Sequence, residues 1–312
     1  MKFSRCAVTL SIMSNIAVVQ ASTIDFGSAL HWRNIGPYRG GRTRAVCGVP
    51  SQPNVFYMAP VNGGVFQSTD YGRTWQPVFD DQPTASIGAI AVSISNPNII
   101  YVGSGEGLHR PDLSIGDGIY KSTDAGKTWT HLGLRDGQQI AQLALDPTNP
   151  ERLFVAVGGH PYGPNEERGI YRSLDGGKTF EKILYRNQDV GASDVQLDPG
   201  NPQIVYAALW ESREAPWENG VFNGDGGGIF KSIDGGKTWK QLREGLPPNI
   251  VQANLAIAPS APKTLFAAVR TKTLSKLYRS DDAGQTWHGT TDDPRPGLGI
   301  GGGDLPVVRF DP

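Results

Sequence analysis

The sequence predicts an all-β protein: a β-propeller of four-stranded antiparallel blades, with five complete blades and an incomplete closing blade. First, the pattern Ser-x-Asp-x-Gly-x-Thr-aromatic, called a box below, occurs five times, and its serines are 54, 51, 59 and 48 residues apart. That spacing is the length of a four-stranded sheet with its turns. Second, a Pro-Asn-rich repeat alternates with the boxes. Third, short runs of β-forming residues flank both repeats.

Each box connects two predicted strands through a tight turn. The box glycine tolerates a positive φ, and the Ser and Asp side chains can hydrogen-bond nearby backbone N–H groups. The aromatic residue is expected to bury beside the turn, removing ~150–250 Å² from water. We therefore interpret the box acids and aromatics as structural residues: Asp70, Asp124, Asp175, Asp234, Asp282, Trp75, Trp129, Phe180, Trp239 and Trp287.

The second repeat fixes the order of strands within a blade. Its clearest copies are Leu145-Asp-Pro-Thr-Asn-Pro150 and Leu197-Asp-Pro-Gly-Asn-Pro202, and a strand-like run such as Leu153-Phe-Val-Ala156 follows each copy. One unit is thus an inner strand, a Pro-Asn turn, a second strand, a variable loop, a third strand, a box and a fourth strand. The first inner strand is expected at about residues 42–49. Because the strands alternate in direction, boxes and Pro-Asn turns should share one face, and the variable loops the other.

The two ends of the chain predict the incomplete blade. Trp32-Arg-Asn-Ile35 has the place of a fourth strand without its first three, and Val307-Val-Arg-Phe-Asp-Pro312 has the place of an inner strand. The second and third strands of that composite blade are missing. Since an open ring leaves strand edges unpaired, we expect the chain to be the N-terminal part of a longer protein.

Composition and the N-terminus predict a secreted protein. Lys2 and Arg5 precede an apolar stretch from Ala7 to Val19 and a small-residue cleavage site at Ala21, which is typical of a signal peptide. We expect a signal peptide at residues 1–21 and the propeller at 22–312. The net charge of −1 argues against a nucleic-acid partner, and no other apolar stretch has transmembrane length. No motif indicates a metal or cofactor, and Cys47 remains without a cysteine partner.

Candidate functional residues lie in the longer loops between second and third strands, at about 103–118, 158–169 and 210–228, because loops on a rigid scaffold usually carry function. Carboxylates beside aromatics suit a sugar cleft, and hydrolysis needs two carboxylates ~5–9.5 Å apart. The catalytic candidates are Glu106, Asp117, Glu166, Glu167 and Glu211. The ligand-binding candidates are Arg110, His160, Tyr162, Trp210 and Trp217. Glu106 and Asp117 have a plain alternative as partners that hold a glycine-rich loop.

The boxes resemble the Asp-box (BNR) repeat of sialidases, sortilin-type receptors and xyloglucanase-like glycoside hydrolases. From about Trp32 onward the chain is similar to a bacterial group of secreted sortilin-like propellers. The segments that carry this similarity are Trp32-Arg-Asn-Ile-Gly-Pro37 with Gly40-Gly-Arg42, Gly103-Ser-Gly-Glu106 with Gly116-Asp-Gly118, Gly163-Pro-Asn-Glu-Glu-Arg168, and Ala208-Leu-Trp-Glu211. The resemblance implies the propeller fold more specifically than it implies an activity.

Two departures from the family patterns weigh against catalysis. Xyloglucanase-like enzymes carry an Asp in Thr-Asp-Val-Gly-Gly, whereas Pro60-Val-Asn-Gly-Gly64 has Val61 at that place. Arg39, Arg42 and Arg44 lack the Phe-Arg-Ile-Pro context of a sialidase arginine triad. We expect a non-catalytic propeller that binds a protein, peptide or glycan through its loop-rich face. The alternative is a glycoside hydrolase of sialidase-like or xyloglucanase-like type acting through loop carboxylates. A third possibility is a structural module whose activity belongs to a C-terminal portion.

Overall fold

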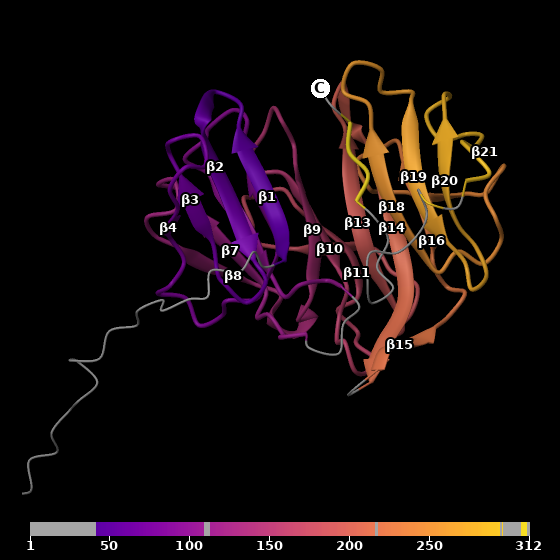
Figure 1. The fold of residues 1–312 in the computed structure, drawn as a ribbon, viewed down its shortest axis with the longest axis horizontal. Helices are drawn as coiled ribbons and strands as arrows, with labels where there is room; N and C mark the ends of the chain where they lie inside the picture. Colours follow the sequence, from indigo (N-terminus) through magenta and orange to yellow (C-terminus); the bar gives the residue numbers. More distant parts are fainter. Residues whose placement is uncertain (1–41, 109–112, 216–217, 294, 296–306, 311–312) are drawn as a thin grey trace, which may run out of the picture. The chain divides into compact units, whose positions relative to one another are not determined.

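Five antiparallel sheets follow one another along the chain in the computed structural model (Figure 1), which describes residues 42–108, 113–215, 218–293, 295 and 307–310. Each sheet runs in chain order from its inner to its outer strand. The first consists of β1 (Thr43–Val49), β2 (Gln52–Pro60), β3 (Phe66–Ser68) and β4 (Gln76–Pro77). The second consists of β5 (Ile87–Val92), β6 (Ile100–Ser104), β7 (Ile119–Ser122) and β8 (Thr130–Gly133).

The remaining three sheets repeat this order, and a short 3-10 helix, η2 (Arg135–Gly137), precedes the third. The third consists of β9 (Ile140–Leu145), β10 (Leu153–Val157), β11 (Gly169–Ser173) and β12 (Glu181–Leu184). The fourth consists of β13 (Val190–Asp198), β14 (Asn201–Ala215), β16 (Gly228–Ser232) and β17 (Lys240–Leu242), with β15 (Glu218–Asn223) paired to β14. The fifth consists of β18 (Gln252–Ile257), β19 (Leu265–Arg270), β20 (Ser275–Ser280) and β21 (His288–Gly289).

The sheets are the blades of a propeller. Each of the inner strands β1, β5, β9 and β13 contacts the inner strand of the next sheet, while the outer strands β4 and β21 lie far from these contacts (Figure 1). Apolar clusters fill the spaces between neighbouring sheets; one of them joins Ile100 and Tyr120 of the second blade to Tyr57 of the first. The predicted fold class, with five complete four-stranded blades, is confirmed.

The segments expected to form the closing blade are only partly described. Trp32-Arg-Asn-Ile35 and the expected signal peptide lie outside the described residues. Residues 307–310 are described and carry no strand. Val307 and Arg309 line the space between the inner strands, together with Arg44 and Asp194, and the Phe310 ring contacts the ring of Phe266 edge-on.

All five boxes form the same set of hydrogen bonds. In the fifth box, the Ser280 hydroxyl donates to the Asp282 carboxylate at 2.8 Å and accepts from the Gly284 N–H at 2.8 Å. Asp282 also accepts from the backbone N–H of Thr286 at 2.9 Å and from its hydroxyl at 2.6 Å. The same four bonds recur in the other boxes. Each box is thus a turn whose own side chains satisfy its backbone.

Each box is also bonded to the Pro-Asn turn of its own blade. The residue before the box glycine donates its N–H to a carbonyl of that turn. The pairs are Tyr71 to Asn54 (3.1 Å), Ala125 to Asn98 (3.0 Å), Gly176 to Glu151 (2.8 Å), Gly235 to Gln203 (2.8 Å) and Ala283 to Lys263 (2.8 Å). Boxes and Pro-Asn turns therefore share one face, called the box face below. The loops between second and third strands lie on the opposite loop face.

Four of the five box aromatics pack against the preceding blade, whereas Trp75 of the first box donates its indole N–H to Gly72 of its own turn. Trp129 donates its indole N–H to the Val78 carbonyl at 2.7 Å, and its ring meets Phe79 of the first blade edge-on. Trp287 packs in the cluster between the fourth and fifth blades and is 4% exposed. The other four box aromatics are only half-buried. The expected burial is therefore nearly complete for Trp287 and partial for the other four aromatics, whose rings remain in part accessible to water.

The third long loop differs from expectation. Residues 210–228 were expected to be irregular, but β14 continues to Ala215 and pairs with β15 beyond the end of the sheet proper. The register joins Ser212 to Asn223 and Arg213 to Phe222. Gly220 lies within β15, and the other glycines of this segment follow the hairpin, at positions 224 and 226–228.

Candidate functional site

A pocket opens on the loop face between the second, third and fourth blades. The second blade contributes Leu108 and Leu113, and the third contributes the segment from Gly158 to Pro161 with Arg168. Trp210, Ser212 and Glu214 of the fourth blade complete the wall. Gln139, Ala141 and Ala192 line it where the inner strands begin. Residues more than 100 positions apart in sequence thus meet at one site.

The fourth-blade wall follows from the extension of β14. Successive side chains of a strand point to opposite faces, so the alternate residues Trp210, Ser212 and Glu214 all face the pocket. The Glu214 N–H donates to the Pro161 carbonyl at 2.7 Å, which ties the extension to the third-blade loop. Trp210 is 7% and Glu214 5% exposed. The extension therefore places an aromatic ring, a hydroxyl and a carboxyl in one row.

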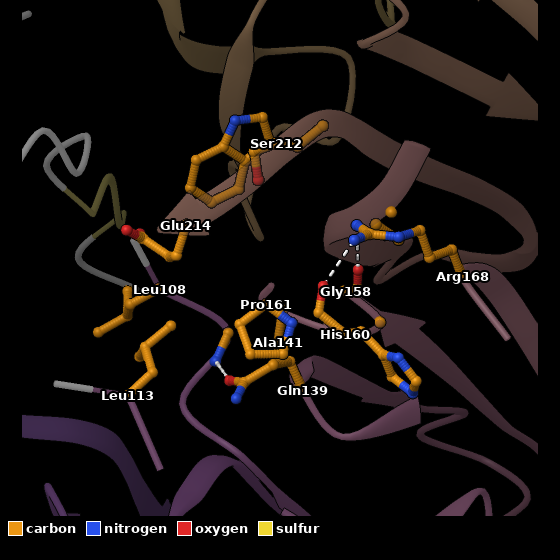
Figure 2. Close-up of a pocket in the computed structure, with 15 residues that line it drawn as sticks. Leu108, Leu113, Gln139, Ala141, Gly158, His160, Pro161, Arg168, Ser212 and Glu214 are labelled. Carbon is orange, nitrogen blue, oxygen red and sulfur yellow. Dashed lines mark hydrogen bonds between the residues drawn. The ribbon is translucent and has the colours of Figure 1, made fainter. Parts of the chain in front are cut away.

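Arg168 shapes the opposite wall. Its guanidinium donates to the carbonyls of Gly158 (2.7 Å), His160 (2.6 Å) and Gly163 (2.9 Å), and the residue is only 2% exposed. Burial, and then the nearby charge of Arg213, lower the pKa of Arg168 to about 10. Figure 2 shows Arg168 and His160 on one side of the pocket, and Leu108, Leu113 and the Glu214 carboxylate on the other. Arg168 thus fixes the shape of the third-blade loop through these three hydrogen bonds. The acidic group that lines the pocket is Glu214.

His160 contributes its backbone more than its ring. The imidazole Nε2 lies 2.8 Å from a carboxylate oxygen of Asp136 in η2, and in Figure 2 the ring points away from Glu214. Asn165 donates its side-chain N–H to the other oxygen of Asp136 at 2.9 Å. Asp136 was not singled out from the sequence, because the contact depends on how the link between two blades folds.

Gln139 connects the second-blade loop to the floor of the pocket. Its side-chain oxygen accepts from the Gly107 N–H at 2.6 Å, and its side-chain nitrogen donates to the Ser114 carbonyl at 3.2 Å. Gln139 is buried and precedes β9. No sequence signal marks it, because glutamine before a strand is common.

Three of the five predicted catalytic acids form contacts within the scaffold. Glu106 is fully buried and is not among the residues that line the pocket. Asp117 accepts from the Tyr120 hydroxyl at 2.7 Å and from Arg135 at 3.1 Å. Glu211 accepts from the Gly226 N–H at 2.7 Å, and a Cβ placed on Gly224 would lie 2.0 Å from its carboxyl carbon. These contacts support the alternative role of Asp117, which is to hold a loop in place. The contact of Glu211 supports the same role for that residue.

The other two predicted acids lie beside the pocket rather than in it. Glu166 is exposed and accepts from the Tyr185 hydroxyl at 3.1 Å. Glu167 is half-buried, and burial, followed by the charge of Asp136, raises the pKa of its carboxyl. The structure brings neither residue to the pocket wall.

Of the predicted ligand-binding residues, Trp210 and His160 line the pocket. Tyr162 is 46% exposed and does not line it. Arg110 and Trp217 lie outside the described residues. Among the described lining residues, Glu214 is the single carboxylate. The described part of the chain contains no group of three His, Cys, Asp or Glu side chains placed to hold a metal ion.

Comparison with known proteins gives two family matches. The family model described as "Sortilin, neurotensin receptor 3" matches residues 63–196, and the BNR/Asp-box repeat matches residues 278–288. Within the described residues, no helix has the length and apolar character needed to cross a bilayer. The chain folds as a β-propeller with Asp-box repeats, and over residues 63–196 it is similar to sortilin-type proteins.

The chain is also similar to xyloglucanases in sequence and to GH74 enzymes in fold. A xyloglucanase of Hypocrea jecorina is 24% identical over 315 residues, covering 88% of this chain and 35% of the relative. A xyloglucanase of a Paenibacillus species is 22% identical over 268 residues, covering 75% and 24%. An ancestral GH74 enzyme aligns with a TM-score of 0.63 at 22% identity, over 83% of this chain and 32% of that one. The Niastella koreensis GH74 enzyme gives 0.61 at 22%, over 79% and 38%. The chain thus spans about a third of the length of these relatives.

Proposed function

We propose that this propeller binds a neutral polysaccharide of the xyloglucan class in the loop-face pocket. The observation that carries the proposal is the row of Trp210, Ser212 and Glu214 along one side of β14. An aromatic ring offers a flat apolar surface to a sugar ring. A serine hydroxyl can donate to or accept from sugar hydroxyls, and a carboxylate can accept from them. Similarity to proteins named xyloglucanase supports this class of ligand.

The pocket favours binding over hydrolysis within the described chain. Glycoside hydrolysis uses two carboxyl groups that flank the scissile bond, and Glu214 is the one carboxylate among the described lining residues. Of the acids that we expected to be candidates, Glu106 is buried and does not line the pocket, and Glu211 accepts from the Gly226 N–H. A ligand can therefore be held in the pocket without the pair of acids that cleaves it.

Hydrolysis is the second candidate, and the matches to xyloglucanases over most of the chain favour it. In that case Glu214 is the first acid, and the second comes from a part of the protein outside the described residues. We also propose that the protein is exported through a signal peptide at residues 1–21. We further propose that the propeller of residues 22–312 continues in a longer polypeptide. The reading frame that follows residue 312 tests the last proposal.

Calorimetric titration with xyloglucan oligosaccharides tests the proposed binding. Glu214→Gln keeps the shape of the side chain but removes its charge, and we expect the affinity to fall about tenfold or more, as for a lost hydrogen bond to a charged group. Glu166→Gln, which makes the same chemical change at an exposed acid outside the pocket, should leave the affinity unchanged.

Three outcomes separate the candidates. Binding without release of reducing sugars, weakened in Glu214→Gln alone, supports the proposal. Release of reducing sugars that disappears in Glu214→Gln supports hydrolysis. If the folded wild-type protein binds no xyloglucan oligosaccharide, or if both variants behave alike, the loop-face pocket is not the binding site.

A further inference from the structure

A groove crosses the outer edge of the fourth blade, where it faces the fifth. It consists of two hollows that share the residues Gln241, Leu242 and Arg243 at the end of β17. The first hollow contains Trp239 and Lys240 and reaches the box face. The second is lined by Arg186 and by the link after β17, and it reaches the loop face. The groove is separate from the loop-face pocket, with which it shares no lining residue.

The groove carries more positive than negative charge. Lys240 and Arg243 are exposed, and neither forms an ion pair with any other described residue. Lys231 donates to the Ala283 carbonyl at 2.7 Å; burial, and to a smaller extent the like charge of Lys240, lower its pKa. Arg186 adds a fourth cation, whereas the acids that line the groove are Glu244 and Asp225. Asp225 already pairs with Lys272 at 3.3 Å.

This charge is not a consequence of the repeat. The outer strand of the third blade begins with Glu181, which pairs with Arg172 at 2.5 Å, and continues with Lys182, which donates to the Glu166 carbonyl. The outer strand of the second blade reads Thr130-His-Leu-Gly133 and contains no lysine or arginine. A blade is therefore stable without unpaired cations on its outer strand. Since like charges in a groove repel one another, a bound anion would stabilise the cations on and beside β17.

The remaining lining residues indicate the chemistry of the ligand. Trp239 packs in part against the cluster between the third and fourth blades and also lines the groove, and the amides of Gln241 and Gln285 lie along it. An aromatic ring with amide side chains suits sugar rings and hydroxyls, and the cations suit carboxylates. We propose that the groove binds an anionic polysaccharide, a chain of uronic acid residues. This site does not depend on the proposed xyloglucan pocket, and it takes a ligand of different charge.

The test uses a polygalacturonate oligosaccharide as the probe, in calorimetric titrations of the full chain at low ionic strength, where exposed charges are little screened. The variant Lys240→Glu/Arg243→Glu reverses both exposed cations. We expect its affinity to fall about tenfold or more relative to wild type, because two attractive contacts become repulsive. The control Lys127→Glu/Lys178→Glu makes the same change of net charge at exposed box lysines of the second and third blades, and it should retain most of the wild-type affinity.

Equal losses in the two double variants, or no binding by the folded wild-type protein at low salt, would overturn the proposal. Tighter binding of poly-glutamate than of polygalacturonate would overturn the saccharide class and indicate an acidic peptide instead. Because all four positions are exposed, matching thermal unfolding curves should verify that the variants fold. A neutral xyloglucan oligosaccharide should bind both double variants as it binds wild type, so failure of the groove and failure of the pocket are distinguishable.

Discussion

The box face and the loop face of this propeller are built in opposite ways. On the box face, five turns form the same hydrogen bonds between residues two to four positions apart. On the loop face, the second, third and fourth blades each hold their loop differently. Asp117 bonds Tyr120 in the second, Arg168 bonds three carbonyls in the third, and Glu211 bonds Gly226 in the fourth.

This difference indicates that the box face serves as the scaffold and that the loop face serves recognition. A turn whose bonds are local can be copied without regard to its neighbours, and it gives each blade the same geometry. Loops that differ from blade to blade can enclose a pocket that none of them forms alone. The comparison predicts that changes on the box face alter stability, while changes at the loop-face pocket alter binding.

The largest effect is expected where a box aromatic is fully enclosed by the preceding blade. Trp287→Ala should lower the free energy of unfolding by about 3–5 kcal/mol, as for other buried aromatic truncations. Trp75 belongs to the first box and is half-buried, with no preceding sheet among the described residues. Trp75→Ala should therefore cost roughly half as much or less. Urea unfolding of the two variants measures the difference; equal losses would show that the aromatic stabilises its own turn rather than the contact between blades.

The box serine provides a second, smaller test. Ser280→Ala removes the acceptor of the buried Gly284 N–H, and an unsatisfied buried donor costs about 1–3 kcal/mol. Ser212→Ala, the same change on the pocket wall, should change stability by less than about 0.5 kcal/mol while weakening the binding of a xyloglucan oligosaccharide. Chemical denaturation of both variants measures the change in stability, and calorimetry measures the change in affinity for the oligosaccharide. Loss of stability at Ser212 without loss of affinity would contradict the division between the two faces.

The two faces should also respond to acid with opposite sign. Hydrogen bonds from the side chain and then the backbone N–H of Thr128 lower the pKa of Asp124 to about 2, below the unfolded value near 3.9. Its contribution to stability is therefore complete above about pH 4 and is lost as the pH falls toward 2. Burial raises the pKa of Glu167, so its contribution is present below its unfolded pKa and is lost as the pH rises through the folded value.

Urea midpoints between about pH 2 and 6 test both signs. Asp124→Asn should lose less stability than wild type on acidification, although it starts from a lower value. Glu167→Gln should gain stability relative to wild type as the pH rises. A Glu167→Gln variant that tracks wild type at every pH would show that this carboxyl is not held in a desolvated site.

The smallest effect concerns the residue before the box glycine. Ala283 has a φ of 61°, in the left-handed region, where the third and fourth boxes have Gly176 and Gly235. Ala283→Gly should therefore raise the free energy of unfolding by about 0.5–1 kcal/mol. Ala267→Gly, in β19 of the same blade, should lower it, because glycine weakens a strand interior. A loss of stability in both variants would mean that backbone strain at the box turns is negligible.

The sequence predicted the box face more completely than the loop face, for a physical reason. Ser280, Asp282 and Thr286 form their bonds within seven residues, so the motif contains the whole structure of the turn. The pocket joins Leu113, Gln139 and Glu214, which become neighbours only after three blades have assembled. Trp210 was identified by its chemistry, but Glu214 was not preferred over Glu211. Glu214 lines the pocket and Glu211 does not, because β14 continues as a strand and places alternate residues on the pocket side.

Hydrogen–deuterium exchange with and without a xyloglucan oligosaccharide tests most directly whether recognition belongs to the loop face. The predicted result is slower exchange in residues 113–115, 158–168 and 208–214, with no change in the five box turns. Slower exchange at the box turns, with the loop-face segments unaffected, would contradict the assignment of one face to scaffold and the other to binding.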